Sequence, residues 1–269
     1  MATLVSFHAH PDDESIIAAG VLRRAADRGH RVVLVFATRG ELGEVEDGFL
    51  NPDEPLWQRR VAETTASAQI LGAARTEFLG YLDSGMMGQP TNDDPACFWQ
   101  APVEDAATRL AEVLREERTD VLTVYDDNGF YGHPDHIQVH RVGMRAAELA
   151  EIDRVYQMTF NRDHMIRGMR AFAEQARAAG VEISEEMEPP DNMGKPEGEI
   201  TARFDVSEQA EVKRASMRAH ASQIGENHGM LTLPEEAFRY AFGTEWAIRA
   251  GQGPGITETD LFAETADPM

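Results

Sequence analysis

The chain has 269 residues, 42% of them hydrophobic, and its 25 basic and 47 acidic residues give a net charge of −22. This length supports a sizeable core in one large or two small domains, and the excess of acids argues against nucleic-acid and membrane partners, because both carry negative charge. With one cysteine, Cys97, no signal-like N-terminus and no apolar run of about 18 residues, we expect a cytoplasmic protein without an internal disulfide.

Short β-branched runs alternate with longer amphipathic stretches along the chain. The predicted strands are residues 3–9, 31–38, 76–80, 120–125 and 154–160, and the predicted helices are 14–28, 54–71, 103–118, 134–150 and 163–179. Continuous apolar strands separated by helices are typical of parallel sheets that are buried on both sides. We therefore predict an α/β fold with a Rossmann-like, mostly parallel sheet and helices on both faces.

The pattern of residues 199–250 predicts a smaller C-terminal α/β segment. It contains a strand-like run at 199–206, a helix near 207–221 and the stretch 239–250. We expect a single domain over residues 1–250, with a core at 1–181 and this segment at 199–250, and then a loose tail at 251–269. Residues 84–101, rich in Gly, Pro, Asn and Asp, form either a lid or a plain surface loop.

Two stretches dense in ionisable residues follow predicted strands. "HAHPDDES" covers residues 8–15, and "YDDNGFYGHPDHIQVHR" covers residues 125–141. Each contains His-Pro-Asp, and proline is favoured at the first position of a helix, so each marks a loop entering a helix. Ligands bind beyond the carboxyl ends of strands in such sheets. Buried carboxylates are costly unless they are paired or metal-bound, so the first stretch calls for a positive partner.

A metal ion would be that partner. His10, Asp13 and His136 make a two-histidine, one-carboxylate set, and three protein ligands with one open position is the usual arrangement of catalytic zinc. His140 lies four residues after His136, which is the spacing of a helical zinc pair, but we expect it to face solvent.

Four further side chains near these ligands predict catalysis. Asp12 is placed as a general base, and His133 is expected to stabilise or protonate what forms, with Asp135 orienting its ring. Tyr131 is expected to polarise a carbonyl oxygen. Together these parts predict metal-assisted hydrolysis of an amide-like bond.

The two motifs also resemble those of the LmbE-like (PIG-L) family of zinc-dependent N-acetylglucosaminyl deacetylases. That family includes the deacetylase of mycothiol biosynthesis and the mycothiol-conjugate amidase. The resemblance rests on "AHPDDE" at residues 9–14 paired with "GHPDH" at residues 132–136, and it extends from residue 3 to residue 250. Further matches are "RRVAETTASAQILG", "FLGYLDSGM" and "KRASMRAHASQ".

The resemblance implies a zinc-dependent hydrolase that removes an N-acetyl group from an N-acetylglucosamine-type sugar conjugate, with iron(II) as the alternative metal in the cell. It implies that His10, Asp13 and His136 bind the metal and that Asp12 is the base. It also implies that His133, held by Asp135, stabilises the charge of the transition state and that Tyr131 lies over the substrate carbonyl.

Arg60 and Asp83 match positions of the family that grip sugar hydroxyls. Each residue also has a plainer interpretation, because Arg60 can pair with Glu63 on one helix face and Asp83 can be an ordinary turn residue. His220 and His228 are expected to pack or cap.

Two rival functions stay open. One is an amidase that cleaves larger thiol-sugar conjugates, such as those of mycothiol. The other is a metal- or sugar-binding protein without turnover, although binding alone would not require Asp12 and His133. The sequence leaves the aglycone, the native metal and the oligomeric state undetermined.

Overall fold

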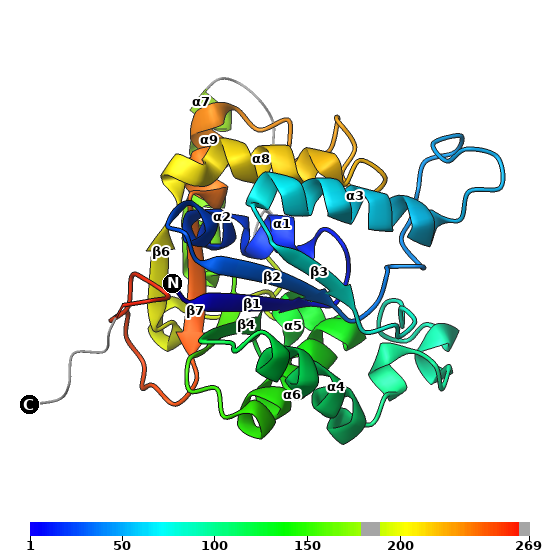
Figure 1. The fold of residues 1–269 in the computed structure, drawn as a ribbon. Coiled ribbons are helices and arrows are strands. Elements are labelled where there is room, and N and C mark those ends of the chain that lie inside the picture. Colours follow the sequence, from blue (N-terminus) through cyan, green and yellow to red (C-terminus); the bar gives the residue numbers. More distant parts are fainter. Residues whose placement is uncertain (179–188, 264–269) are drawn as a thin grey trace, which may run out of the picture.

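A computed structural model describes residues 1–178 and 189–263, and within them one sheet of seven strands runs in the order β3-β2-β1-β4-β5-β7-β6 (Figure 1). The five N-terminal strands pair in parallel, while β7 runs antiparallel to β5 and β6 antiparallel to β7. Their bounds are β1 (Thr3–His8), β2 (Arg31–Phe36), β3 (Arg75–Phe78), β4 (Val121–Tyr125), β5 (Val155–Thr159), β6 (Ala202–Asp205) and β7 (Thr244–Arg249). The predicted fold class is confirmed.

Helices cover both faces of this sheet (Figure 1). One face carries α1 (Asp13–Ile17), α2 (Ala19–Asp27), α3 (Leu56–Leu71) and α8 (Ala210–Ala219). The other carries α4 (Val103–Glu116), α5 (Gly129–Gly132) and α6 (Pro134–Ala150). The two further α-helices of the described residues are α7 (Arg162–Ala178) and α9 (Glu235–Phe242). Residue 179, the expected end of the helix at 163–179, lies outside the described residues.

The central strands form the core because both of their faces are buried. Every residue of β1 and β4 is buried. The helix α6 approaches β4 closely at Gly143, where an added Cβ would lie 2.3 Å from Val124 Cγ1. Leu110 and Leu114 of α4 are fully buried in the same cluster. This packing fixes the strand ends from which the polar motifs emerge.

The expected helix at 14–28 is two helices, which corrects the sequence-based prediction. Ala18 has φ −135°, so α1 ends there and α2 begins directly after it. The Glu245 carboxylate accepts hydrogen bonds from Gly20 N and Val21 N, both at 2.8 Å, and so caps the start of α2. Because the capping residue comes from β7, the residues around Ala18 do not indicate that the helix is divided there. The stretch 239–250 is likewise divided, since its first residues complete α9 before β7 begins.

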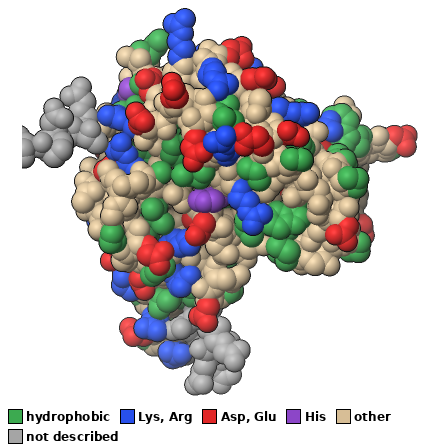
Figure 2. Space-filling view, turned by 90° about the horizontal axis from the view of Figure 1, so that it is seen from below, with side chains coloured by type: hydrophobic (Ala, Val, Ile, Leu, Met, Phe, Trp, Pro, Cys, Tyr) green, Lys and Arg blue, Asp and Glu red, His purple; other side chains and the backbone are tan. Residues whose placement is uncertain are grey.

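Surface charge is mixed on the face that lies over α4 and α6. Acidic, basic and apolar side chains are interspersed there (Figure 2). Arg145 pairs with Glu104 and with Glu148, each at 2.8 Å, so part of the net charge is locally balanced on this face. No helix in the ranges 1–178 and 189–263 has the length and apolar character that crossing a membrane requires.

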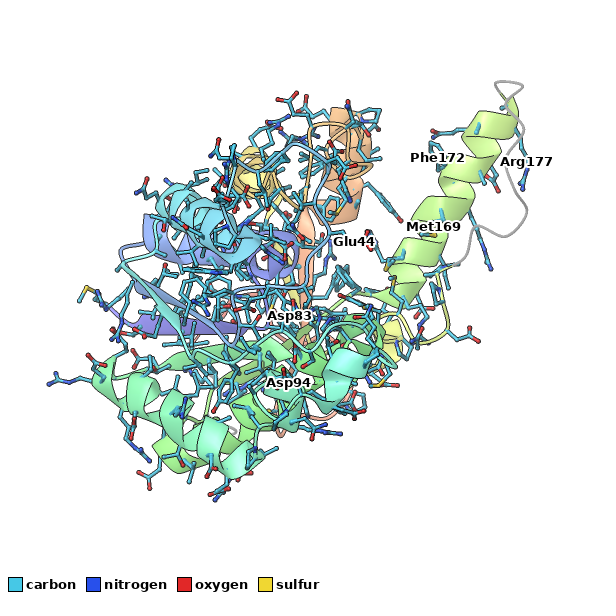
Figure 3. All side chains as sticks on the ribbon, turned by 90° about the vertical axis from the view of Figure 1, so that its right-hand side faces the viewer. Glu44, Asp83, Asp94, Met169, Phe172 and Arg177 are labelled. Carbon is cyan, nitrogen blue, oxygen red and sulfur yellow. The ribbon has the colours of Figure 1, made fainter. Side chains whose placement is uncertain are left out.

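Figure 3 looks onto the carboxyl ends of the parallel strands. Asp83 lies near the middle of this edge, and Glu44 lies on the loop above it. The helix α7, with Met169 and Phe172, extends away from the body of the molecule. The loop after β2 and the helix α7 therefore both border the carboxyl edge.

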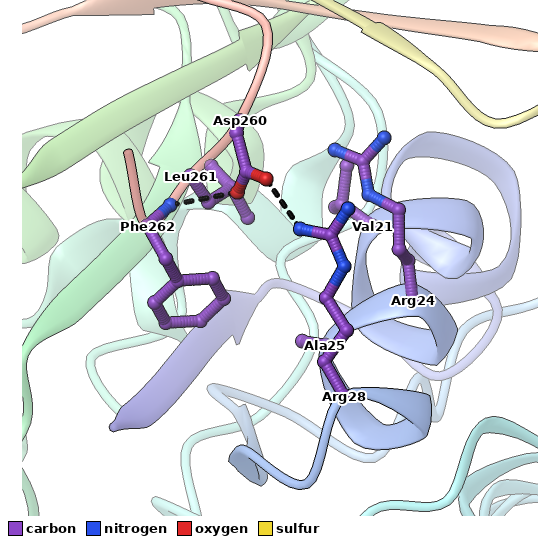
Figure 4. Close-up of a pocket in the computed structure, with 7 residues that line it drawn as sticks. All are labelled: Val21, Arg24, Ala25, Arg28, Asp260, Leu261 and Phe262. Atoms are coloured by element: carbon purple, nitrogen blue, oxygen red, sulfur yellow. Dashed lines mark hydrogen bonds and ion pairs between the residues drawn. The ribbon is translucent and has the colours of Figure 1, made fainter. Parts of the chain in front are cut away.

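Within the described part of the expected tail at 251–269, residues 260–262 contact the body of the fold. Asp260 forms an ion pair with Arg28, directly after α2 (Figure 4), and the Phe262 ring stacks on His30 with ring centroids 3.8 Å apart. Leu261 is only 2% exposed and belongs to the main core cluster. Apolar burial therefore anchors the chain at Leu261, and residues 264–269 of the expected tail lie outside those described.

If this packing contributes to stability, Leu261→Ala should lower the free energy of unfolding by about 2 kcal/mol or more, as large-to-small changes at buried sites do. Ile256→Ala is the matched control, because Ile256 lies in the same segment but is 40% exposed; we expect about 0.5 kcal/mol or less there. Urea unfolding measures both, and equal values would mean that the segment adds nothing to the core.

Candidate active site

Both His-Pro-Asp motifs lie at the same edge of the sheet because β1 and β4 are parallel neighbours. The two strand ends are tied together by Ser6 Oγ and Thr123 Oγ1 at 2.6 Å and by His8 Nδ1 and Tyr125 Oη at 3.0 Å. Burial lowers the pKa of His8 to about 4, so its imidazole is neutral. His8 thus holds the strands together, and the ligand candidates follow it in the loop.

The three predicted ligand atoms form a small triangle. His10 Nδ1 lies 3.3 Å from His136 Nε2 and 3.6 Å from Asp13 Oδ2, and the last two atoms lie 3.5 Å apart. All three residues are buried. Tetrahedral zinc with bonds of 2.0–2.2 Å to nitrogen and oxygen separates its ligand atoms by about 3.3 Å. The triangle therefore has the dimensions and the donor chemistry of a metal site.

His10 uses its other nitrogen for orientation. Its Nε2 lies 3.1 Å from Asp135 Oδ2 and 3.5 Å from Asp83 Oδ1, which leaves Nδ1 to face Asp13 and His136. Asp135 is itself held by the backbone N–H of Ser84 at 2.9 Å and by the Ser84 hydroxyl. A carboxylate on the distal nitrogen of a ligating histidine fixes its tautomer and ring orientation.

The expectation that Asp135 holds His133 is wrong, because the Asp135 carboxylate pairs with His10. His133 Nδ1 instead accepts a hydrogen bond from the Asp135 backbone N–H at 3.1 Å, at the N-terminus of α6. This leaves the proton of a neutral His133 on Nε2. Burial, followed by the charges of His10 and His136, lowers the pKa of His133 to about 3 and favours that neutral form.

Asp12 sits beside the ligand triangle in a strained conformation. Its φ is 102°, a backbone angle that residues other than glycine rarely adopt. Strained backbone of this kind is often found at functional sites. Burial raises the pKa of Asp12 to about 6, although the Arg60 charge opposes the shift. A carboxylate that titrates near neutrality suits a general base.

Arg60 grips the loop that carries Asp12. It is only 3% exposed, and its guanidinium donates to the carbonyls of Gly40 (2.9 Å) and Pro11 and lies 3.3 Å from Asp12 Oδ2. The alternative pairing with Glu63 is wrong, because Glu63 accepts from Ser222 N and Oγ at 2.8 and 2.6 Å. The expected contact of Arg60 with a sugar stays a prediction.

Asp83 is a turn residue next to the ligand candidates, and its expected contact with sugar hydroxyls stays a prediction. It accepts from Gly85 N at 2.8 Å within the turn and from Leu42 N at 3.3 Å. Burial alone would raise the pKa of Asp83, but His10 and the Gly85 N–H hold it well below its usual value. Asp83 is therefore ionised beside His10.

Tyr131 lies on the short helix α5, with its ring centroid 5.1 Å from that of His136. The backbone bends sharply there, since Phe130 has φ 66° and an added Cβ on Gly129 would lie 2.4 Å from His136 Cβ. The backbone carbonyl of Tyr131 accepts from Asn192 Nδ2 at 3.0 Å. Burial raises the pKa of Tyr131, so its phenol stays protonated as a hydrogen-bond donor.

Two residues next to the site were not assigned from the sequence. Glu14 and His220 are fully buried, and His220 Nε2 lies 2.5 Å from Glu14 Oε1. Burial opposes ionisation of both side chains, but the negative charge of Glu14 and the positive charge of His220 stabilise each other. The pKa of Glu14 therefore falls to about 2, and that of His220 rises. The acid of "AHPDDE" and the histidine of "KRASMRAHASQ" were visible signals, but only the fold shows that they meet.

Other histidines lie away from the triangle. His140 Nδ1 faces the backbone carbonyl of Tyr125 at 3.0 Å, and His228 Nδ1 accepts from Met230 N at 3.2 Å in a surface turn. The loop at 84–101 packs through buried Phe98 and Cys97 and supplies Ser84 to the site.

The sequence is similar to proteins of known activity over almost its whole length. Residues 5–147 match the family PIG-L, GlcNAc-PI de-N-acetylase. The 1D-myo-inositol 2-acetamido-2-deoxy-alpha-D-glucopyranoside deacetylase of Salinispora arenicola is 40% identical over 280 residues, which cover 97% of this chain and 90% of that protein. The protein of the same name from Thermobifida fusca is 38% identical, with coverages of 97% and 98%.

Solved structures share the fold at low identity. The N,N'-diacetylchitobiose deacetylase from Pyrococcus horikoshii has a TM-score of 0.51 at 20% identity and covers 88% of this chain and 73% of its own. The 4-carboxy-2-hydroxymuconate hydratase from Pseudomonas putida has a TM-score of 0.56 at 18% identity, with coverages of 96% and 99%. Since one is a deacetylase and the other a hydratase, the fold alone does not decide the reaction.

Fold, site and close relatives together define a metal-dependent N-deacetylase on an α/β scaffold. The chain belongs to the PIG-L family of de-N-acetylases. The resemblance to the LmbE-like (PIG-L) family and the expected removal of an N-acetyl group from an N-acetylglucosamine-type conjugate are both confirmed.

The pairing of Asp135 with His10 generates a prediction about the metal. Asp135→Asn should weaken metal affinity about 10- to 100-fold, the usual effect of removing a carboxylate behind a ligating histidine. Asp126→Asn is the matched control, because Asp126 is equally buried at the end of β4 but bonds Asn128 N, Phe130 N and Thr159 Oγ1. Competition with a chelator measures both affinities, and equal values would show that Asp135 does not act on the metal through His10.

Proposed function

We propose that this enzyme removes the acetyl group from an N-acetylglucosaminyl inositol, the substrate in the names of its relatives at 38–40% identity. The observation that carries the proposal is the triangle of His10, Asp13 and His136, at 3.3–3.6 Å, with Asp12 beside it. The alignment spans 97% of the chain, so the proposal concerns the whole enzyme.

We infer that zinc is the metal and that His10, Asp13 and His136 hold it. Two imidazoles and a carboxylate fit zinc, and their separations match its bond lengths; iron(II) is the second candidate, because it uses the same donor set. When bound, the metal would polarise the acetyl carbonyl and lower the pKa of the attacking water.

The chain's own residues would then move protons and stabilise charge. Asp12 takes a proton from the attacking water as it adds to the acetyl carbonyl, and later passes that proton to the leaving amine. The Nε2–H of His133 and the phenol of Tyr131 donate hydrogen bonds to the oxygen that becomes negative. Both side chains are neutral donors, as their pKa shifts require.

Substrate orientation is assigned to Asp83 and Arg60. Asp83 is ionised beside His10, so it would accept hydrogen bonds from sugar hydroxyls near the acetamido group. Arg60 would act mainly by holding the loop of Pro11 and Asp12, since its guanidinium is already committed there. The small amino-sugar substrate and the single cysteine agree with a cytoplasmic location, which we also propose.

A pair of substrates tests the reaction. The purified enzyme should release acetate from an N-acetylglucosaminyl inositol, with a kcat/KM at least about tenfold above that for cleavage of a larger thiol-sugar conjugate. Acetate and free amine are measured in parallel, and elemental analysis of the same sample gives the metal. Preferential cleavage of the larger conjugate would favour the amidase assignment over the deacetylase. Absence of turnover on both substrates would favour a metal- or sugar-binding protein.

Asp12→Asn separates chemistry from metal binding. Asparagine keeps the shape and tolerates positive φ, so the variant should fold and keep its metal while losing about 10²–10⁴-fold in kcat. Steady-state kinetics and metal analysis on one preparation provide the comparison. A kcat close to that of the parent would show that a group other than Asp12 is the general base.

A further inference from the structure

A fully buried pair lies beneath the loop that carries Asp12. Glu14 of α1 and His220, just after α8, are both 0% exposed, and they are 206 residues apart in sequence. Burying such a pair is favourable only when its remaining hydrogen-bonding capacity is satisfied. The contacts of each Glu14 oxygen therefore show what the pair holds in place.

One oxygen of Glu14 is anchored to three elements. Oε1 accepts from His220 Nε2 at 2.5 Å, from Ser67 Oγ of α3 at 2.5 Å and from Ser15 Oγ at 2.9 Å. The hydroxyls of Ser15 and Ser67 also contact Ser216 Oγ of α8, at 2.5 and 2.8 Å. The carboxylate is thus fixed in position by α1, α3 and the end of α8.

The other oxygen of Glu14 reaches the active site. Oε2 accepts a hydrogen bond from the backbone N–H of Asp12 at 3.0 Å. Asp12 is the residue with φ 102°, and such a conformation persists only where the surroundings impose it. Arg60 also holds this residue, through Pro11 O and Asp12 Oδ2.

We propose that Glu14 and His220 are positioning residues for Asp12: His220 fixes Glu14, and Glu14 holds the Asp12 backbone in the strained conformation that aims its carboxylate at the water. Neither residue touches substrate or metal in this assignment. The inference rests on the proposed function, in which Asp12 is the base, and it gives a role to the "HASQ" end of the C-terminal motif.

A second buried pair provides a matched control. Lys213 Nζ of α8 lies 2.7 Å from Glu245 Oε1, and both side chains are 2% exposed. Glu245 uses its oxygens for Gly20 N and Val21 N, so this pair caps α2. Removing Lys213 therefore removes one partner of a buried ion pair from the helix that precedes His220, without altering a bond to Asp12.

The experiment compares His220→Ala, His220→Gln and Lys213→Met with the parent, each loaded with its metal. His220→Ala should lower kcat about 10- to 100-fold, the scale expected for a misplaced catalytic group, with KM and bound metal within about twofold of the parent. His220→Gln, whose amide still donates to Glu14, should recover part of the loss. Lys213→Met should lose thermal stability but keep kcat within about twofold.

A crystal structure of each variant gives a readout independent of turnover. Asp12 should leave the region near φ 102° in His220→Ala and keep it in Lys213→Met. If His220→Ala does not fold, Ser67→Ala tests the same point, since it removes only one hydroxyl from Glu14 Oε1, and it should change kcat and Asp12 in the same direction.

Three results would overturn the inference: parental kcat in His220→Ala, equal losses of kcat in His220→Ala and Lys213→Met, or an unchanged Asp12 backbone in His220→Ala or its substitute. A parent enzyme that releases no acetate would instead refute the proposed function, and the Asp12 conformation would still decide whether Glu14 and His220 hold this residue.

Discussion

Parallel pairing of β1 with β4 is the constraint on which the site depends. The register pairs Leu4 with Val121 and Ser6 with Thr123, so both strands end at the same level of the sheet. Each is then followed by a loop that enters a helix through His-Pro-Asp. Two motifs far apart in the sequence thus become neighbours because their strands pair, and a change of strand order would separate them.

Charge balance is the second requirement at this edge. The His10 ring is surrounded by the carboxylates of Asp13, Asp83 and Asp135, all buried. Burial disfavours the charged form of His10, yet these acids raise its pKa well above the usual value, so the cluster needs positive charge. A divalent metal would satisfy that need better than one proton, and ligand deprotonation would couple its binding to pH.

The sequence predicted the features that depend on local pattern. Alternation of apolar strands and helices gave the parallel sheet, and the paired motifs predicted the residues that form the ligand triangle. It did not predict contacts made across the fold. The break at Ala18 depends on Glu245 of β7. The backbone N–H of Asp135 bonds the His133 ring, and the Asp135 carboxylate is therefore free to pair with His10. The packing of Asp260 and Phe262 depends on Arg28 and His30, which lie between α2 and β2.

The separation of the site's parts along the chain also governs how the enzyme assembles. His10 and His136 are 126 residues apart, and Glu14 and His220 are 206 apart, so these contacts close very long loops. Contacts of this kind form slowly, because chain entropy is lost before they stabilise the fold. During synthesis, His10 and Asp13 leave the ribosome well before His136. His220, which fixes Glu14 beneath Asp12, follows last. Metal affinity and catalytic competence should therefore be acquired as separate, late events in folding.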